Sequence, residues 1–279
     1  MSCTVSCSGV VTSELALAHL LADAADEISS FHFESDSLVV ETKADGTPVT
    51  AVDRAVEARL SDLLATHRPD DGFLGEEVGH SGPARRRWIV DGIDGTHNYV
   101  RRSPGWGTLI ALEDDGEIVI GLMTSPALGR RWWAERGGGA WTGPPSANTA
   151  DDATALRCTT TDVIDGALIV VTPPDRYIAE EYVPVASALR RRDPDAQTSF
   201  AHAALAVAEG TADAALVLRG GEWDYAAVAV IVEEAGGTFS DLWGGRRLDT
   251  GTAVYSNGAL HPAILAIAAG SRPASPGRA

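Results

Sequence analysis

The stretch Trp88–Thr96, WIVDGIDGT, joins an apolar run directly to two acidic residues. Its first three residues have the composition of a buried β-strand. Asp91 and Asp94 come at the end of that strand, and Gly95 can then begin a helix whose free backbone N–H groups face the same point. Carboxylates bind hard cations, and helix N-termini bind phosphate. The stretch therefore predicts a site for metal-assisted phosphate chemistry.

The overall charge limits the partners that we expect. The chain carries 39 acidic and 22 basic residues, which gives a formal net charge of −17. Because such a surface repels nucleic acid and anionic lipid, we expect neither a nucleic-acid nor a membrane partner. The same charge repels a small phosphate ester, so a phosphatase of this composition needs bound metal ions as a local positive focus.

Cysteine usage and hydropathy predict a cytoplasmic protein. Cys3, Cys7 and Cys158 form neither a disulfide framework nor a zinc-binding pattern. The N-terminal region lacks a basic segment followed by an apolar run, and no apolar stretch is long enough to span a bilayer.

Apolar periodicity and turn signals predict mixed helices and strands, the pattern of an α/β (α+β) protein. The predicted helices cover 12–30, a segment that follows an N-cap at Thr50, 180–192, 201–209, 225–235 and 261–269. Besides the strand that ends at Asp91, the predicted strands cover 38–42, 73–77, 107–113, 118–124, 130–135, 139–142, 167–172, 214–218, 238–242 and 253–257. The small, polar segment 143–152 contains proline and is the predicted boundary between two lobes. We expect the Pro/Ser/Gly-rich tail 271–279 to be disordered.

Acidic residues also end other predicted elements, at Asp53, Glu76–Glu77 and Asp224. Each of these has a simpler explanation when taken alone, since Asp224 can cap the helix that follows it. Asp53 can be an exposed helix residue, and Glu76–Glu77 a solvated loop. Asp91 and Asp94 differ, because two acids at the end of a buried strand repel each other unless a cation or a proton lies between them.

Three segments taken together resemble the signatures of the inositol monophosphatase superfamily of magnesium-dependent phosphomonoesterases. They are Gly75–Glu77, Trp88–Tyr99 and Trp223–Ala227, in the same order and at similar separations, and the resemblance covers roughly 12–270. It implies a layered αβαβα sandwich of the inositol monophosphatase and fructose-1,6-bisphosphatase type. Residues 1–150 would form an α+β lobe with a large antiparallel sheet, and 151–270 a second lobe that supplies Asp224 and the substrate pocket. The resemblance also implies a homodimer.

The resemblance implies Mg²⁺ as the cofactor, with about two or three ions in each site. Glu76, Asp91 and the carbonyl of Ile93 would hold the first ion. Asp91, Asp94 and Asp224 would hold a second ion, so that Asp91 bridges the two.

The same resemblance assigns catalytic and phosphate-binding roles. Thr96, paired with Asp53, would orient and deprotonate the attacking water, and Glu76 would belong to the catalytic set as well as to the metal site. The N–H groups of Gly95 and Thr96 would hold phosphate oxygens. Lys43, the one lysine beside 21 arginines, would lie near the phosphate and the metals.

The substrate is predicted from a narrower resemblance. Segments 41–57, 98–101 and 125–133 look most like histidinol-phosphatase, which makes histidinol phosphate the expected ester. A sugar, cyclitol or nucleoside monophosphate is the alternative, and adenosine 3′,5′-bisphosphate a further one, because Glu222–Ala227 also resembles the phosphatases of that compound. A non-catalytic regulatory protein that binds metal or phosphate is the alternative from another class. Trp132 and Trp133 serve either as packing or as a wall of the pocket.

Two positions depart from these patterns. Gly92 stands where the family commonly has proline, which predicts a looser turn between the metal-binding acids. Arg219 precedes Trp223 in a segment that tends to be acidic in histidinol-phosphatases, and only Glu222 is acidic here. Arg219 is either a solvated charge or a pocket residue that favours a neutral or second anionic group. With His202, Arg219 and Glu222 are the candidate substrate contacts.

Overall fold

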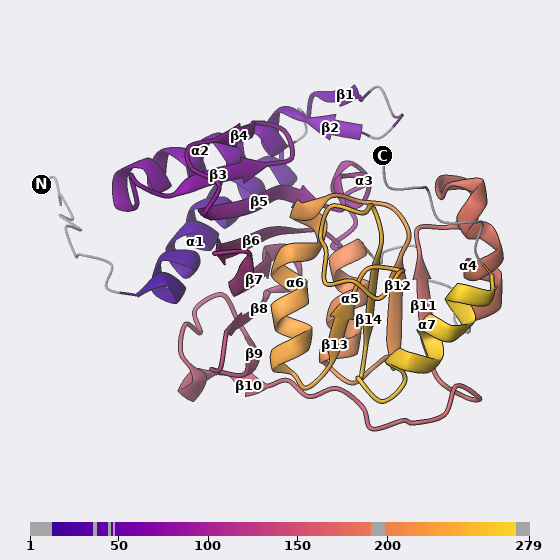
Figure 1. Ribbon diagram of the computed structural model, residues 1–279. Coiled ribbons are helices and arrows are strands. Elements are labelled where there is room, and N and C mark those ends of the chain that lie inside the picture. Colours follow the sequence, from indigo (N-terminus) through magenta and orange to yellow (C-terminus); the bar gives the residue numbers. More distant parts are fainter. Residues whose placement is uncertain (1–12, 36–37, 44–45, 47, 191–198, 272–279) are drawn as a thin grey trace, which may run out of the picture.

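Five layers of helix and sheet make up the computed structural model, which describes residues 13–35, 38–43, 46, 48–190 and 199–271. Helices α1 (Glu14–Phe33) and α2 (Ala51–His67) cover one face of a large sheet, and α5 (Phe200–Ala208) and α6 (Glu222–Glu234) cover its other face (Figure 1). A smaller sheet packs against the other side of α5 and α6, and α4 (Val183–Leu189) and α7 (His261–Gly270) form the outer layer beyond it. This order confirms the expected αβαβα sandwich.

The large sheet has eight strands in the order β10-β9-β8-β7-β6-β5-β3-β4. All neighbours are antiparallel except β3 and β5, which run parallel. The strands are β3 (Gly72–Gly75), β4 (Gly79–Ser81), β5 (Arg86–Asp94), β6 (Gly107–Asp114), β7 (Glu117–Ser125), β8 (Arg130–Glu135), β9 (Ala140–Gly143) and β10 (Thr154–Ala155). The central strand β5 is buried over its last seven residues, which places its acidic end inside the molecule.

The smaller sheet has the order β11-β12-β14-β13, and its first two strands are parallel. The strands are β11 (Ile169–Thr172), β12 (Ala214–Val217), β13 (Thr238–Ser240) and β14 (Ala253–Ser256). Outside the two sheets lie the pair β1 (Val40–Thr42) and β2 (Pro48–Thr50), the short helix α3 (Thr96–Val100) and 3₁₀ turns at Pro126–Leu128, Ala150–Asp152, Asp175–Tyr177 and Glu180–Tyr182. Because β11 and β12 are parallel neighbours, the loops that follow them emerge at the same edge.

Helix α6 is apolar on all sides over Tyr225–Val232, which suits its position between the two sheets. Nine of its residues are buried, including Tyr225 and Val230. On the side of the large sheet it packs against β7 at Gly121, where an added Cβ would lie 2.1 Å from the carbonyl oxygen of Ala227. The helix can approach this closely only because β7 carries no side chain there.

Some predicted boundaries were wrong. The helix predicted over 225–235 begins at Glu222, so Asp224 lies in its first turn and not before it. The described part of the helix predicted over 180–192 is a 3₁₀ turn followed by α4, and 191–192 lie outside the described residues. The α-helix begins at Val183 and not at Glu180, since Pro184 fits only the first turn of an α-helix. The predicted N-cap at Thr50 is present.

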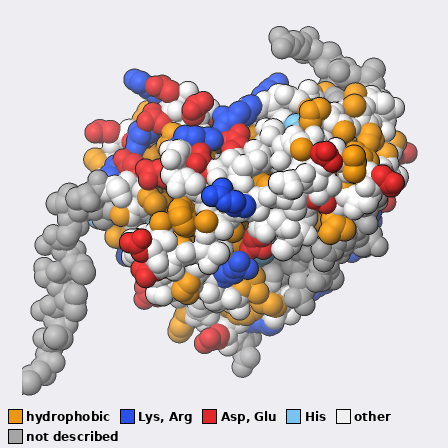
Figure 2. All heavy atoms as spheres, turned by 90° about the horizontal axis from the view of Figure 1, so that it is seen from below, with side chains coloured by type: hydrophobic (Ala, Val, Ile, Leu, Met, Phe, Trp, Pro, Cys, Tyr) orange, Lys and Arg blue, Asp and Glu red, His pale blue; other side chains and the backbone are white. Residues whose placement is uncertain are grey.

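The predicted division into two lobes stays a prediction. Strand β10 pairs with β9 and so extends the large sheet past residue 150. All but the first residue of the predicted disordered tail lies outside the described residues. No helix among the described residues has both the length and the apolar character to cross a membrane. On the face shown in Figure 2, acidic and basic side chains are interspersed rather than separated by sign.

We expect Gly121→Ala to lower the free energy of unfolding by about 3 kcal/mol, because the new methyl group would push α6 away from β7. Urea denaturation measures this loss. Gly270→Ala is the matched control, since nothing lies within 4 Å of a Cβ at that position. An equal loss of stability in both variants would contradict the close packing at Gly121.

Candidate metal and phosphate site

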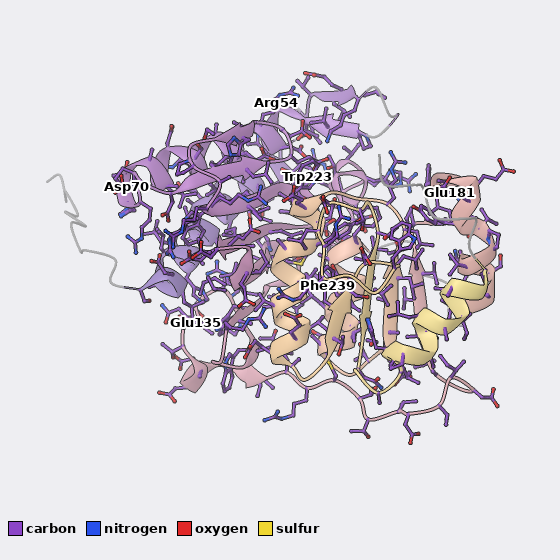
Figure 3. All side chains as sticks on the ribbon, viewed as in Figure 1. Arg54, Asp70, Glu135, Glu181, Trp223 and Phe239 are labelled. Carbon is purple, nitrogen blue, oxygen red and sulfur yellow. The ribbon has the colours of Figure 1, made fainter. Side chains whose placement is uncertain are left out.

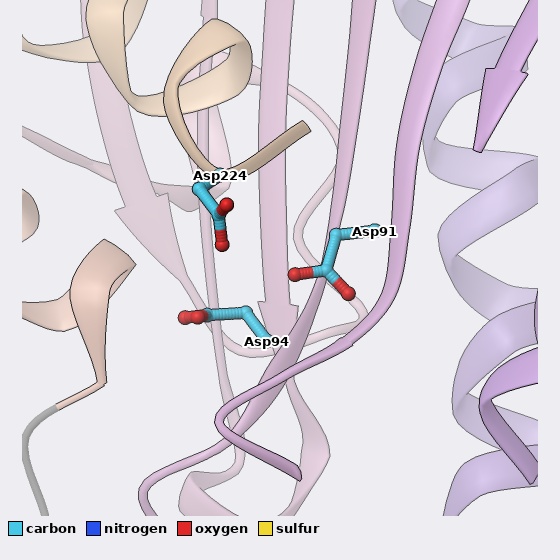
Figure 4. A group of neighbouring side chains, drawn as sticks. All are labelled: Asp91, Asp94 and Asp224. Carbon is cyan, nitrogen blue, oxygen red and sulfur yellow. The ribbon is translucent and has the colours of Figure 1, made fainter. Parts of the chain in front are cut away.

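Three buried carboxylates meet where β5 ends and α6 begins. Asp91, Asp94 and Asp224 each offer an oxygen within 4.8 Å of the others, and they surround a common space (Figure 4). Their exposed fractions are 2, 3 and 8%. The pairing of β5 with β6 shifts between Asp91 and Asp94, so the two acids lie at an irregularity of the strand rather than in the regular alternation.

The backbone before α6 holds Asp224 in place. Its Oδ2 atom accepts a hydrogen bond of 2.6 Å from the backbone N–H of Gly221. Gly220 has a φ of 151°, and a Cβ at that position would lie 2.8 Å from the same oxygen. This close approach requires a glycine. Trp223 marks this end of the helix in Figure 3.

Burial and mutual repulsion raise the pKa values of these acids. Burial, followed by the charges of Glu76 and Asp94, raises the pKa of Asp91 and of Asp224 well above the usual range. Burial raises the pKa of Asp94 to about 6, although hydrogen bonds from Ser199 and two backbone N–H groups oppose the shift. Neutralising such a cluster requires protons or a cation.

The donor set fits magnesium. All three side chains are carboxylates, and Mg²⁺ prefers hard oxygen ligands, which it completes with water. Burying several negatively charged carboxylates close together also destabilises the folded state unless a cation is bound. Asp91, Asp94 and Asp224 would therefore hold Mg²⁺ at this point.

Glu76 lies close to this cluster but contacts the lysine. Its Oε1 atom is 2.6 Å from Nζ of Lys43, which also forms an ion pair with Glu77. Burial would lower the pKa of Lys43, but its hydrogen bonds to Glu76 and Glu77 raise it above the usual range. The structure thus brings two predicted residues together, with a permanent positive charge beside the carboxylates.

Thr96 and Asp53 are in contact, as their predicted pairing requires. The Thr96 hydroxyl lies 3.1 Å from Oδ1 of Asp53 and 3.0 Å from the carbonyl oxygen of Ile93. Oδ2 of Asp53 accepts from the N–H and the hydroxyl of Thr50, so Asp53 also completes the capping box of α2. Burial raises the pKa of Asp53 despite these bonds, which makes its carboxylate a better proton acceptor.

Gly95 occupies the turn between Asp94 and α3. Its φ of 81° is in the left-handed region, and a Cβ would lie 2.8 Å from the carbonyl oxygen of Gly105. Both conditions favour glycine. The backbone N–H groups of Gly95 and Thr96 therefore lie next to the acidic cluster.

Glu57 is a buried residue of this region that sequence reasoning missed. Its carboxylate accepts hydrogen bonds from the N–H groups of Glu77 and Val78, at 3.0 and 2.9 Å, and a longer one of 3.4 Å from Gly92. Burial raises its pKa to about 7, although these bonds lower it. Glu57 lies one helical turn after Asp53, and this spacing was the available signal. It ties the loop of Glu76 to the turn of Asp91.

Gly92, in the turn between Asp91 and Asp94, is closely surrounded by neighbouring backbone and side-chain atoms. Its N–H donates to Oε1 of Glu57 at 3.4 Å, and its carbonyl oxygen accepts a hydrogen bond from the Thr108 hydroxyl at 2.8 Å. A Cβ at this position would lie 2.6 Å from the carbonyl oxygen of Asp53. A proline would lack the N–H and would also meet that carbonyl.

Ser199 and His202 stand behind Asp94. The Ser199 hydroxyl lies 2.5 Å from Oδ2 of Asp94 and 2.6 Å from Nδ1 of His202. Since this hydroxyl has one proton and Asp94 accepts it, Nδ1 of His202 must carry the proton that joins it to Ser199. The ring packs edge-on against Trp132. His202, a predicted substrate contact, is therefore placed as a support of Asp94, and Ser199 was missed.

The two other predicted substrate contacts lie in different surroundings. Arg219 lines a cavity of about 550 Å³, together with Arg176 and Tyr177. Glu222 lies 2.5 Å from a guanidinium nitrogen of Arg87 and does not line that cavity.

Both tryptophans of β8 are packing residues. Trp132 and Trp133 are 3 and 1% exposed, and Nε1 of Trp132 donates to Glu209. The structure therefore favours the packing interpretation.

The comparisons with known proteins agree with this site. A model of the inositol monophosphatase family matches residues 11–272, and the chain belongs to this family. It is thus a metal-dependent phosphatase, a phosphoric monoester hydrolase that acts on small-molecule phosphate esters, as predicted. The family is generally dependent on Mg²⁺.

The chain is similar to named relatives and to solved structures over most of its length. It is 40% identical to a histidinol-phosphatase of Streptomyces coelicolor, over 90% of this chain and 95% of that one. It is 39% identical to a histidinol-phosphatase of Mycobacterium tuberculosis, over 90% of this chain and 96% of that one. The crystal structure of the extragenic suppressor protein suhB from Bartonella henselae has a TM-score of 0.79 at 26% identity, covering 90 and 96% of the two chains.

We expect Glu57→Gln to raise the Mg²⁺ concentration needed for half-maximal activity by about tenfold, because the amide keeps only one acceptor atom. Its nitrogen then faces either the N–H of Gly92 or the N–H groups of Glu77 and Val78 that hold the Glu76 loop. A Mg²⁺ titration of hydrolysis measures this shift. Glu27→Gln, at an exposed position of α1, is the control. An unchanged Mg²⁺ requirement would show that Glu57 does not position the site.

Burial lowers the pKa of His202 to about 4, so the folded state favours the neutral ring. The stabilising effect is present above the unfolded pKa of about 6.5 and is lost as pH falls toward 4. Between pH 7 and 5 we expect the wild type to lose ~2 kcal/mol more than His202→Asn, in which the amide replaces the Nδ1–H donor. Urea unfolding at both pH values tests this, and equal losses would contradict a buried neutral ring.

Proposed function

We propose that this chain hydrolyses its phosphate monoester with a metal-activated water, using Asp91, Asp94, Asp224 and Glu76 as ligands of two or more Mg²⁺ ions. The observation that carries the proposal is the meeting of three buried carboxylates beside a hydroxyl–carboxylate pair. Bound Mg²⁺ would supply charge neutralisation and a lowered pKa for coordinated water.

Thr96 and Asp53 have the arrangement that a proton relay needs. When the Thr96 hydroxyl donates to Asp53, its oxygen is free to accept from a water molecule at the cluster. A proton can then pass from the water to Thr96 while the Thr96 proton passes to Asp53. The Thr50 contacts hold the Asp53 carboxylate in the required orientation.

The groups beside the carboxylates suit an incoming phosphate. We assign the backbone N–H groups of Gly95 and Thr96 to the phosphate oxygens. Both residues lie in the turn that joins Asp94 to α3. Lys43 supplies a fixed positive charge next to Glu76 and limits the repulsion between the acidic cluster and an anionic ester.

Two candidate substrates have separate support. The names of the relatives at 40 and 39% identity support histidinol phosphate as the first ester to test. The presence of Arg219 in the cavity lining supports an ester whose remaining part is neutral or anionic. The homodimer and the cytoplasmic location stay predictions.

We expect Asp91→Asn and Asp224→Asn to lower kcat by more than a hundredfold and to abolish the rise in melting temperature on adding Mg²⁺. In EDTA both variants should melt higher than the wild type at pH 7.5, because each removes a like charge from the cluster. The substrate is p-nitrophenyl phosphate, and Asp165→Asn, an exposed position, is the control.

Near wild-type Mg²⁺-dependent turnover in Asp91→Asn would overturn the metal site. A Mg²⁺-dependent rise in the melting temperature of the wild type, without hydrolysis of any phosphomonoester, would instead favour the non-catalytic binding protein.

A further inference from the structure

A cavity opens next to the metal cluster, between the loops that follow β11 and β12. Its wall includes Arg176 and Tyr177 from the first loop and Arg219 and Gly220 from the second, with Thr250 closing one side. Because β11 and β12 are parallel neighbours, these two loops leave the same edge of the small sheet. The cavity, of about 550 Å³, has room for more than a phosphate group.

Gly220 connects this cavity to the metal-binding residues. It lines the cavity, and a Cβ at its position would lie 2.8 Å from Oδ2 of Asp224. Gly220 therefore places the cavity next to Asp224, within reach of an ester whose phosphate lies among the three carboxylates.

The charged residues of the lining are both arginines. Nη1 of Arg219 donates to the carbonyl oxygen of Tyr177 at 3.4 Å, and the guanidinium of Arg176 lies 4.6 Å from the centre of the Tyr177 ring. These contacts place two planar donor groups on one side of the cavity. Arginine binds carboxylate and phosphate groups through paired N–H donors.

A third arginine lies close to the same side. Burial lowers the pKa of His97, and the charges of Arg101 and Arg176 lower it further. A hydrogen bond from Arg176 lowers the pKa of the Tyr177 hydroxyl, and Arg101 adds to this effect. Arg101 ends helix α3, which begins at Thr96, so positive charge extends from the phosphate side toward the cavity.

Two acids near the cavity are engaged by other side chains: Glu181 by Tyr182 and Glu222 by an arginine. Glu222, in the first turn of α6, pairs with Arg87 at 2.5 Å, and Arg87 also binds Glu113. No acidic residue belongs to the lining of this cavity. The charged side chains of the lining are thus opposite in sign to the overall charge of −17.

We propose that the substrate carries, besides the phosphate that is hydrolysed, a second anionic group, a carboxylate or a phosphate, which binds Arg176 and Arg219. This inference rests on the proposed function, because the ester must be held at the carboxylate cluster. It disfavours histidinol phosphate, whose ammonium group would meet the two guanidinium groups.

Matched pairs of esters test the inference. 3-Phosphoglycerate and glycerol 3-phosphate differ in a carboxylate, and glucose 1,6-bisphosphate and glucose 6-phosphate differ in a second phosphate. We expect kcat/KM to be at least tenfold higher for the anionic member of one pair than for its neutral partner and than for histidinol phosphate. The pair that shows the preference identifies the group.

Two variants assign the preference to the cavity. In Arg219→Gln and in Arg176→Gln the preference for the anionic ester should fall at least tenfold, through a higher KM. Arg219→Lys should restore part of it, since the charge remains. Arg85→Gln is the control, because it makes the same change in net charge at a 79%-exposed ion pair with Asp115.

A tenfold preference for histidinol phosphate, or a preference unchanged in both glutamine variants, would overturn the inference and leave the proposed function intact. The absence of Mg²⁺-dependent hydrolysis of any ester, p-nitrophenyl phosphate included, would overturn the proposed function and this inference with it.

Discussion

Repulsion among buried carboxylates is the constraint on which the rest of this structure depends. Asp91, Asp94 and Asp224 are almost fully buried and share one small space. The surrounding fold holds them there with neutral donors, such as the Gly221 N–H on Asp224 and the Ser199 hydroxyl on Asp94. Such donors stabilise each charge without balancing it, so the cluster keeps its affinity for a cation.

The same constraint explains why the site lies between layers. Asp91 and Asp94 belong to the large sheet, whereas Asp224 arrives on a helix that contacts both sheets. The packing of α6 on Gly121 therefore sets a distance between carboxylates as well as a core contact. Positioning by a helix and a strand is more precise than positioning by loops.

The sequence predicted those parts of the site that depend on local spacing. Two acids at a strand end, a glycine turn and a helix start lie within nine residues, and the structure brings Asp224 and the Thr96–Asp53 pair to them. The layered fold followed from the resemblance and was confirmed. Element ends were less accurate, because α6 begins three residues before its predicted start.

The supporting residues could not be predicted in the same way, because their contacts join distant parts of the chain. Glu57 binds the N–H groups of Glu77 and Val78, and Arg87 binds Glu222, 135 residues further on. An acid on a helix and an arginine on a strand have many possible partners, and only the fold selects one. His202 shows the same limit, since the sequence placed it near the substrate and the structure places it behind Ser199.

The residues proposed for hydrolysis and those proposed for substrate choice belong to different elements of this fold. The carboxylates and the hydroxyl–carboxylate pair belong to β5, α2, α3 and α6, whereas the arginines of the cavity follow β11 and β12. Gly220, with no side chain, is where the two regions meet. The proposal implies that charges in these loops can change without moving the metal-binding acids, so that one hydrolytic centre can serve phosphate esters whose alcohol parts differ in charge. Arg219 fits this proposal, in a segment where the resemblance to histidinol-phosphatases alone predicts acidic residues.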